Sequence, residues 1–157
     1  MCRRGARLDE LALSFNGGKD CLVLLLLFLS CLHQHHLPPR AAAAKIHSVY
    51  VTSVDPFAEV DAFVAACTAR YALEVHRYAQ PMKAAFATHL RAHPRVRAVF
   101  VGTRRADPHG APLSHFDRTD HGWPDFMRVQ PVIDWHYRHI WAVCFFSPPP
   151  RSCTGTG

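Results

Sequence analysis

Short apolar runs alternate with longer stretches of helical spacing along the first hundred residues. The apolar runs, each with the length and composition of a buried strand, are Leu11–Phe15, Ile46–Thr52, Leu73–Tyr78 and Val96–Val101. The longer stretches between them, which predict helices, are Cys21–His36, Phe57–Tyr71 and Met82–Ala92. Strands that are apolar on both faces and separated by helices predict an α/β fold, with a parallel sheet covered by helices on both sides.

The leucine-rich run Cys21–Leu32 needs a separate interpretation, because three arginines precede it and it resembles the apolar region of a signal peptide. It is well short of the ~20 residues that cross a bilayer. Lys19 and Asp20 directly precede it, and no small-residue cleavage site follows. We therefore expect a buried helix that ends before Pro38, a cytoplasmic protein and no membrane partner.

Regular periodicity disappears between Asp107 and Pro131, a segment rich in Pro, His, Asp, Gly and Trp and too long for a simple connection. Asp134–Val143 then has the pattern of a short aromatic helix, and Ser147–Gly157 has the composition of a disordered tail.

The composition indicates the class of protein but does not identify its ligand. The 157 residues are 49% hydrophobic and 19% charged, which is typical of a single globular domain. The formal charge of +6 favours an anionic ligand, but a nucleotide, a nucleic acid and an acidic membrane all meet that condition. The six cysteines include no C-x-x-C pair, which indicates free thiols in a reducing compartment.

The first candidate site is the loop Ser14–Asp20 (SFNGGKD), between the first predicted strand and helix. Gly17 and Gly18 would let backbone N–H groups approach phosphate oxygens, and the helix would direct its positive end at the same place. Lys19 adds a cation, and Asp20 could hold Mg²⁺ through its water shell. A plain tight turn is the alternative interpretation.

Two further segments carry candidate chemistry. Gly102–Pro108 (GTRRADP) follows the fourth predicted strand, and its arginine pair could neutralise a triphosphate or form only a solvated basic turn. Gly122–Arg128 (GWPDFMR) offers aromatic rings that could stack on a heteroaromatic ligand or fill the core. The tract His33–His36 is not predicted to bind metal, and no spacing of the twelve histidines specifies a zinc site.

Together the three motifs resemble the FAD synthase (FMN adenylyltransferase) domain of eukaryotes, within the broader family of PAPS reductase-like ATP pyrophosphatases. The resemblance runs from about Leu11 to Trp141 and includes DWHYRHIW at 134–141. It implies an adenine nucleotide alpha hydrolase-like fold. It also implies transfer of the adenylyl group of ATP to FMN, giving FAD and pyrophosphate, with Mg²⁺ as cofactor and no covalent intermediate.

The resemblance also assigns roles to residues of this chain. The catalytic set is Asn16, Asp20, Arg104 and Asp107. The ATP-binding set is Ser14, Asn16, Gly17, Gly18, Lys19, Asp20, Gly102, Arg104 and Arg105. The flavin-binding set is Trp123, Met127, Arg128, Asp134 and Trp135. The residue assigned to the metal is Asp20.

The resemblance stops near Val143, where members of the family continue into a segment that helps bind FMN. We therefore predict a domain over residues 1–143 and a divergent, disordered tail over 144–157. One alternative is a catalytically impaired form that binds nucleotide or pairs with a longer isoform without turnover. Another is a tRNA-modifying or sulfur-transferring ATP pyrophosphatase, although the chain has no basic run with interleaved aromatics and no C-x-x-C. The partners we expect are ATP and FMN, without nucleic acid.

Overall fold

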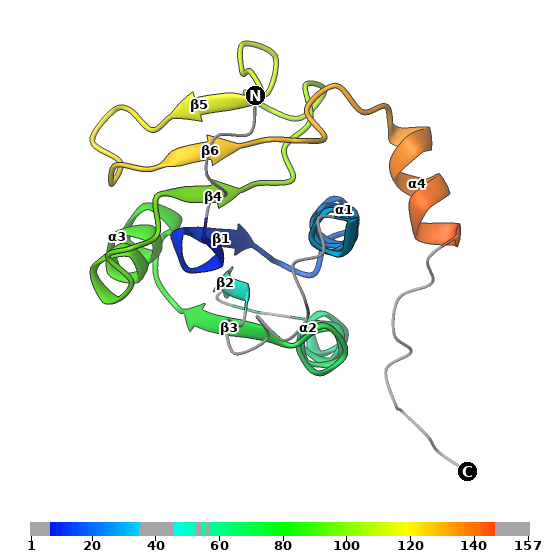
Figure 1. Ribbon diagram of the computed structural model, residues 1–157, viewed down its shortest axis with the longest axis horizontal. Helices are drawn as coiled ribbons and strands as arrows, with labels where there is room; N and C mark the ends of the chain where they lie inside the picture. The colour runs from blue at the N-terminus through cyan, green and yellow to red at the C-terminus, as the bar shows by residue number, and fades with distance from the viewer. Residues whose placement is uncertain (1–6, 35–45, 53–54, 56, 147–157) are drawn as a thin grey trace.

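A six-stranded sheet forms the centre of the protein, whose computed structural model describes residues 7–34, 46–52, 55 and 57–146. The strands are β1 (Leu11–Ser14), β2 (Ile46–Val51), β3 (Leu73–Tyr78), β4 (Ala98–Phe100), β5 (Phe116–Arg118) and β6 (Met127–Val129). They lie in the order β3-β2-β1-β4-β6-β5, and every neighbouring pair is parallel except β5 with β6 (Figure 1). The predicted parallel sheet is confirmed, with one antiparallel strand added at its edge.

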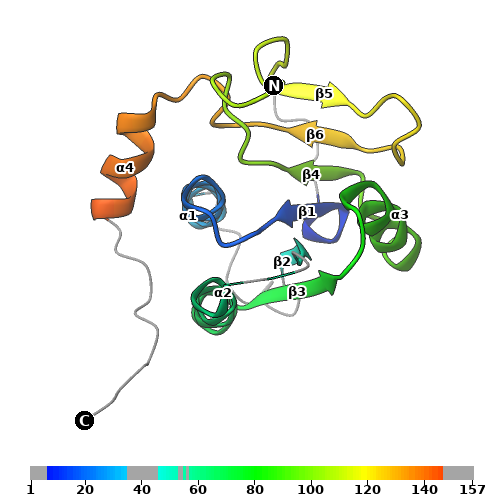
Figure 2. The ribbon, with the colours of Figure 1, turned by 180° about the vertical axis from the view of Figure 1, so that it is seen from behind.

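Helices cover both faces of this sheet, as predicted. They are α1 (Lys19–Gln34), α2 (Ala58–Tyr71), α3 (Met82–Ala92) and α4 (Tyr137–Phe146), and a short 3₁₀ helix, η1 (Leu8–Glu10), precedes β1. Figures 1 and 2 show α1 and α2 on one side of the sheet, α3 on the other, and α4 outside α1. The predicted end of the first helix, between His36 and Pro38, lies outside the described residues.

The core follows from the alternation of side chains along the strands. Leu13 and Tyr50 pack with α1 and α2, whereas Ala12, Val49 and Val99 pack with α3. In α1 the consecutive residues 22–25 are all buried, which confirms the interpretation of the leucine-rich run as a buried helix. Among the helices in the described part of the chain, none has both the length and the apolar character needed to cross a membrane.

Two expectations are corrected at the C-terminal end. Residues 107–131 contain β5 and β6, which at three residues each are too short to show alternation in the sequence. The last helix begins at Tyr137 rather than Asp134, because Asp134 pairs with Arg105 and the Trp135 N–H donates to the Val132 carbonyl in a preceding turn. It continues to Phe146, three residues into the segment assigned to the tail, and 147–157 lie outside the described residues.

Candidate active site

A cavity of about 450 Å³ lies at the carboxyl ends of β1 and β4, and all three sequence motifs line it. The predicted site residues in its wall are Ser14, Asn16, Gly18, Asp20, Gly102, Asp107, Trp123 and Arg128. Its volume is typical of a small-molecule site, and its position is where ligands bind in open α/β sheets.

The loop after β1 is held in a fixed shape by its own side chains. The Asn16 Oδ1 accepts a hydrogen bond from the Gly18 N–H at 2.9 Å. Gly17 has a φ of +77°, in the left-handed region that favours glycine, and a Cβ there would lie 3.1 Å from a Val64 methyl group. The loop leads directly into α1 at Lys19, so the positive end of the helix macrodipole lies at the cavity. This is an arrangement that binds anions.

Gly102 lets the end of β4 approach this loop closely. A Cβ on Gly102 would lie 3.1 Å from the Asp20 carbonyl carbon and 3.2 Å from the Cys21 nitrogen. Because both contacts are backbone atoms at the start of α1, a larger residue would force the two motifs apart. The glycine of the second motif therefore sets the distance between the motifs.

Four charged residues form a network beneath the loop. The Arg104 Nε lies 2.8 Å from Asp20 Oδ1, although its N–H is not directed at that oxygen, so the contact is an ion pair rather than a hydrogen bond. The Arg104 Nη2 and backbone N–H donate to the Asp107 carboxylate at 3.1 and 2.8 Å. Lys19 Nζ donates to Asp20 Oδ2 at 2.9 Å. Both carboxylates of the network are thus oriented by cations.

Arg105, predicted to bind ATP, instead fastens a loop. Its Nε donates to Asp134 Oδ1 at 2.7 Å, and its Nη1 donates to the carbonyls of Ala111 and Leu113 at 3.0 and 2.9 Å. Asp134, predicted on the flavin side, is therefore its ion-pair partner. Neither lines the cavity, but Leu113 does, so this pair shapes the wall from outside.

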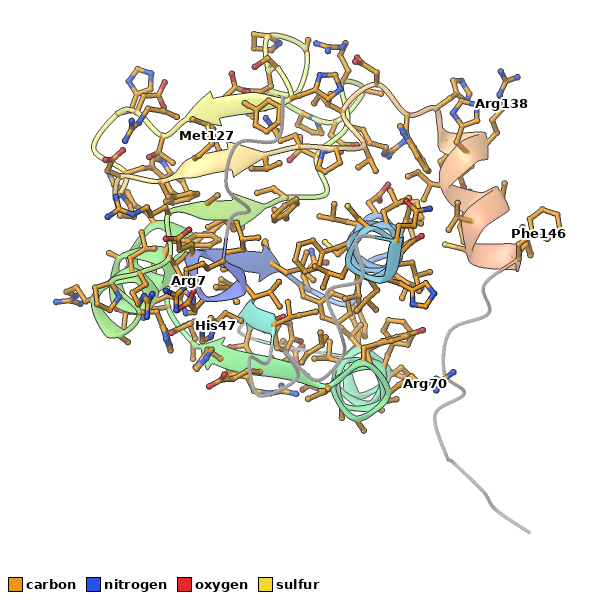
Figure 3. The ribbon with its side chains drawn as sticks, viewed as in Figure 1. Arg7, His47, Arg70, Met127, Arg138 and Phe146 are labelled. Carbon is orange, nitrogen blue, oxygen red and sulfur yellow. The ribbon has the colours of Figure 1, made fainter. Side chains whose placement is uncertain are left out.

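The third motif contributes both a core residue and cavity residues. Phe126 is buried, with its ring centroid 5.2 Å from that of Phe86, whereas Trp123 is half-buried and lines the cavity. Arg128 lines the cavity too, and its buried Nε has no hydrogen-bond partner in the described part of the protein. Met127, labelled in Figure 3, is the next residue on β6 and therefore faces the other side of the sheet.

The remaining flavin-side residue, Trp135, is half-buried against Val23 and Ile140, between α1 and α4, and does not line the cavity. It supports the helix that packs behind the loop.

Six lining residues lie outside the three motifs, namely Cys21, Met82, Phe86, Val101, Leu113 and Gln130, and the motifs themselves also contribute Thr103, Pro108 and Phe126. Gln130 is only 1% exposed, and its Nε2 donates to the Ser114 carbonyl and to Asp117 Oδ2 at 2.9 and 2.8 Å. Burial alone would raise the pKa of Asp117, but hydrogen bonds from Ser114 and Gln130 and the charge of Arg128 lower it overall. Asp117 therefore stays ionised beside Arg128.

The chain matches the phosphoadenosine phosphosulfate reductase domain family over residues 10–95 and 74–145, which together cover most of its length. The chain belongs to this family. A relative from Schizosaccharomyces pombe named probable FAD synthase is 45% identical over 134 residues, which are 85% of this chain and 51% of the relative.

Solved structures of FMN adenylyltransferases are also similar to this chain. Candida glabrata FMN adenylyltransferase in complex with FMN and the ATP analogue AMPCPP is 36% identical, with a TM-score of 0.84 over 91% of this chain and 51% of that one. The same enzyme in complex with FAD and inorganic pyrophosphate is 35% identical, with a TM-score of 0.82 over 89% and 48%. The chain spans about half the length of the curated relatives it matches. The similarity to eukaryotic FAD synthases that the motifs predicted is confirmed.

Proposed function

We propose that this chain carries the nucleotide-binding part of an FAD synthase, which transfers the adenylyl group of ATP to FMN and releases pyrophosphate. The observation that carries the proposal is the single cavity in which the loop after β1, the end of β4 and the Trp123–Arg128 segment meet. A protein 36% identical to this chain binds FMN and an ATP analogue. The net charge of +6 also suits two anionic substrates.

The phosphates of ATP would bind at the loop after β1. Gly18 lines the cavity, so a phosphate could approach its backbone, and the first turn of α1 directs the positive end of the helix dipole at the same place. Gly17 supplies the positive-φ turn and packs against Val64. Asn16 fixes the shape of the loop through its hydrogen bond from the Gly18 N–H, so little conformational entropy would be lost when ATP binds. Lys19 is close enough to the loop to add a mobile cation.

Mg²⁺ fits the chemistry of the acidic residues here. Asp20 and Asp107 line the cavity with carboxylate oxygens, the ligands that Mg²⁺ prefers, and Asp20 Oδ1 is a buried oxygen without a hydrogen bond among the described residues. Cations already lie within 3 Å of both Asp20 oxygens, so Asp20 would hold the ion through its water shell. When bound with ATP, Mg²⁺ would neutralise charge on the phosphates.

We assign the flavin side to Trp123 and Arg128, which line the same cavity as the loop. The Trp123 ring offers a flat apolar surface to an isoalloxazine ring, and Arg128 offers a guanidinium to the FMN phosphate. Met127, Asp134 and Trp135 lie outside the lining, so we assign them to the support of this wall. Arg105 acts with Asp134 in that role.

Adenylyl transfer needs no protein nucleophile. An FMN phosphate oxygen attacks the α-phosphorus of ATP, a P–O bond forms, the bond to the β-phosphate oxygen breaks, and pyrophosphate leaves with the electron pair. The chain would align the two phosphates and stabilise the charge that develops on the α-phosphate, with Arg104 held in place by two carboxylates. Free thiols at the four described cysteines are consistent with the cytosol as the proposed compartment.

The test is product formation from FMN and Mg-ATP by the purified chain, with FMN and FAD separated by chromatography and pyrophosphate measured in parallel. We expect FAD and pyrophosphate in equal amounts, and Asp20→Asn should abolish both. Mg-ATP binding without FAD would restrict the proposal to nucleotide binding. A requirement for RNA in place of FMN would overturn it.

A further inference from the structure

Four histidines lie together between α3 and the β2–β3 edge of the sheet, away from the cavity. His47 comes from β2, His76 from β3, His89 from the last turn of α3, and His93 from the position directly after that helix. Figure 3 labels His47 on the strand beside α3. His47 is paired in register with Glu74, and residues two apart on a strand share a face, so His47, Glu74 and His76 all face α3.

Three of these imidazoles are arranged as metal ligands are. One ring nitrogen from each of His47, His76 and His93 lies within 4.8 Å of the other two. The carboxylate of Glu74 lies beside two of these rings, with Oε2 3.6 Å from His47 Nδ1 and Oε1 3.6 Å from His76 Nε2, but it is outside the three-histidine group. In tetrahedral zinc sites with bonds of about 2.0–2.1 Å, ligand atoms lie roughly 3.4 Å apart. Small rotations of the three imidazoles would bring their nitrogens to that spacing, and a change of the Glu74 rotamer would be needed for its carboxylate to join them.

Two ring nitrogens of these histidines are unpaired among the described residues. His47 Nδ1 and His76 Nε2 are buried and have no hydrogen-bond partner in the part of the chain that the structure describes. Buried polar atoms nearly always have a partner, because leaving one unpaired costs about 1–3 kcal/mol. Glu74, at 3.6 Å from each ring, is too far to form a hydrogen bond with either.

The fourth histidine has a partner of its own. His89 Nδ1 lies 3.0 Å from the Tyr78 hydroxyl, and the His89 ring centroid lies 4.6 Å from that of His93. His89 is therefore a packing residue beside the three-histidine group.

We propose that His47, His76 and His93 bind one Zn²⁺ ion, with Glu74 as the fourth ligand. Three nitrogens and one carboxylate oxygen are a ligand set suited to zinc. With all four positions filled by protein, the ion would be structural and would cross-link the end of α3 to β2 and β3.

This site is separate from the proposed active site. Met82 and Phe86, in the first half of α3, line the cavity, whereas His93 follows the last residue of the same helix. From Phe86 to His93 the helix advances seven residues, or about 10 Å. Zinc binding would therefore be independent of ATP and FMN, and failure of the FAD synthase proposal would leave it unaffected.

The test is titration of the tag-free, chelator-treated chain with Zn²⁺ in competition with a chromophoric chelator, followed by Co²⁺ as a spectroscopic probe. We expect one equivalent of tightly bound Zn²⁺ and visible Co²⁺ absorption of the tetrahedral type. The variant H47Q/H76Q/H93Q should lose both. The matched control H33Q/H35Q/H36Q removes the same number of histidines from the sequence tract at 33–36 and should keep both.

A second variant keeps the test decisive if the triple variant fails to fold. His93→Gln changes only the C-cap residue of α3, and it should weaken Zn²⁺ binding more than the roughly 10–100-fold that loss of an outer-shell partner costs. Zn²⁺ should also raise the thermal midpoint of the wild-type chain by about 5 °C or more at a hundredfold excess over Kd. Absence of stoichiometric binding by the wild-type chain, or equal binding by folded His93→Gln, would overturn the proposal.

Discussion

The guanidinium of Arg104 and the carboxylate of Asp20 form an ion pair, 2.8 Å from Nε to Oδ1, that joins the segment after β4 to the first turn of α1. Their side chains are 11% and 19% exposed, so water screens the pair only in part. Asp107 contacts the same guanidinium from the other side. One arginine therefore holds together carboxylates from two sequence motifs before any phosphate binds.

Replacement of Arg104 by glutamine should disturb both folding and nucleotide binding. Asp20 and Asp107 would lose their shared cation, and we expect the free energy of unfolding to fall by about 1–3 kcal/mol. The affinity for Mg-ATP should fall at least tenfold, because the carboxylates would repel the phosphates. Urea unfolding and calorimetric titration measure the two effects. Arg91→Gln, on the exposed side of α3, is the control and should change neither.

Gly102→Ala tests whether the close approach of β4 to α1 is required. The added methyl group would lie 3.1–3.2 Å from backbone atoms of Asp20 and Cys21, so the start of α1 must shift. We expect a loss of about 1–3 kcal/mol in stability, as for other overpacked sites, and a weaker affinity for Mg-ATP. The same unfolding and titration measurements apply. Wild-type affinity in a folded Gly102→Ala variant would show that the loop tolerates the displacement.

Most of the fold was predictable because its elements have strong local signals. The strand Leu73–Tyr78 and the helix Met82–Ala92 have the bounds that their patterns predict. The strands β5 and β6 gave no such signal, since their pairing depends on the hydrogen bonds of Thr119 with Phe126 and on the turn between them. The antiparallel pairing of β5 with β6 could therefore not be predicted from the sequence.

The candidate site was predictable to the extent that it lies at strand ends. Motifs that follow neighbouring strands must converge, and Asn16, Asp20 and Asp107 do line one cavity. The pairing of Arg105 with Asp134 depends on the path of the chain between them, which no local pattern specifies. The histidine cluster was unpredictable for the same reason. Its members are far apart in sequence and meet only after β2, β3 and α3 have packed.

Alkylation of the cysteines should report occupancy of the cavity. Among the four described cysteines, Cys31 is exposed and should react first with iodoacetamide at pH 8. Burial raises the pKa of Cys21, and it raises the pKa of Cys67 to about 11, so both carry little of the reactive thiolate at that pH. Cys21 lines the cavity, so saturating Mg-ATP should slow its modification further, with no effect at Cys31. Peptide mass spectrometry follows each site, and equal rates at Cys21 with and without bound Mg-ATP would place the nucleotide elsewhere.

His89 should make the metal-free protein sensitive to acid. It is fully buried, and burial, followed by the charges of neighbouring histidines, lowers its pKa from 6.5 to about 3. A base with a lowered folded-state pKa binds its proton more weakly in the native state than in the unfolded one. Its neutral form is therefore favourable above about pH 6.5, and stability is lost as the pH falls from there toward 3. The groups that face it are His47, His76, His93, Tyr78 and, beyond the rings, Glu74.

His89→Gln isolates this contribution, since glutamine does not titrate and can still form a hydrogen bond with the Tyr78 hydroxyl. In the presence of a chelator, the wild-type chain should lose up to about 1.4 kcal/mol of unfolding free energy per pH unit below 6.5 through His89 alone. The variant should show a shallower decline, although it is less stable at pH 8 because its side chain fills the site less well. Urea unfolding at pH 8, 6, 5 and 4 measures both curves. Parallel curves would mean that protonation of His89 does not cause the loss of stability at low pH. His76 and His93, whose pKa values are also lowered, would then be the next residues to replace.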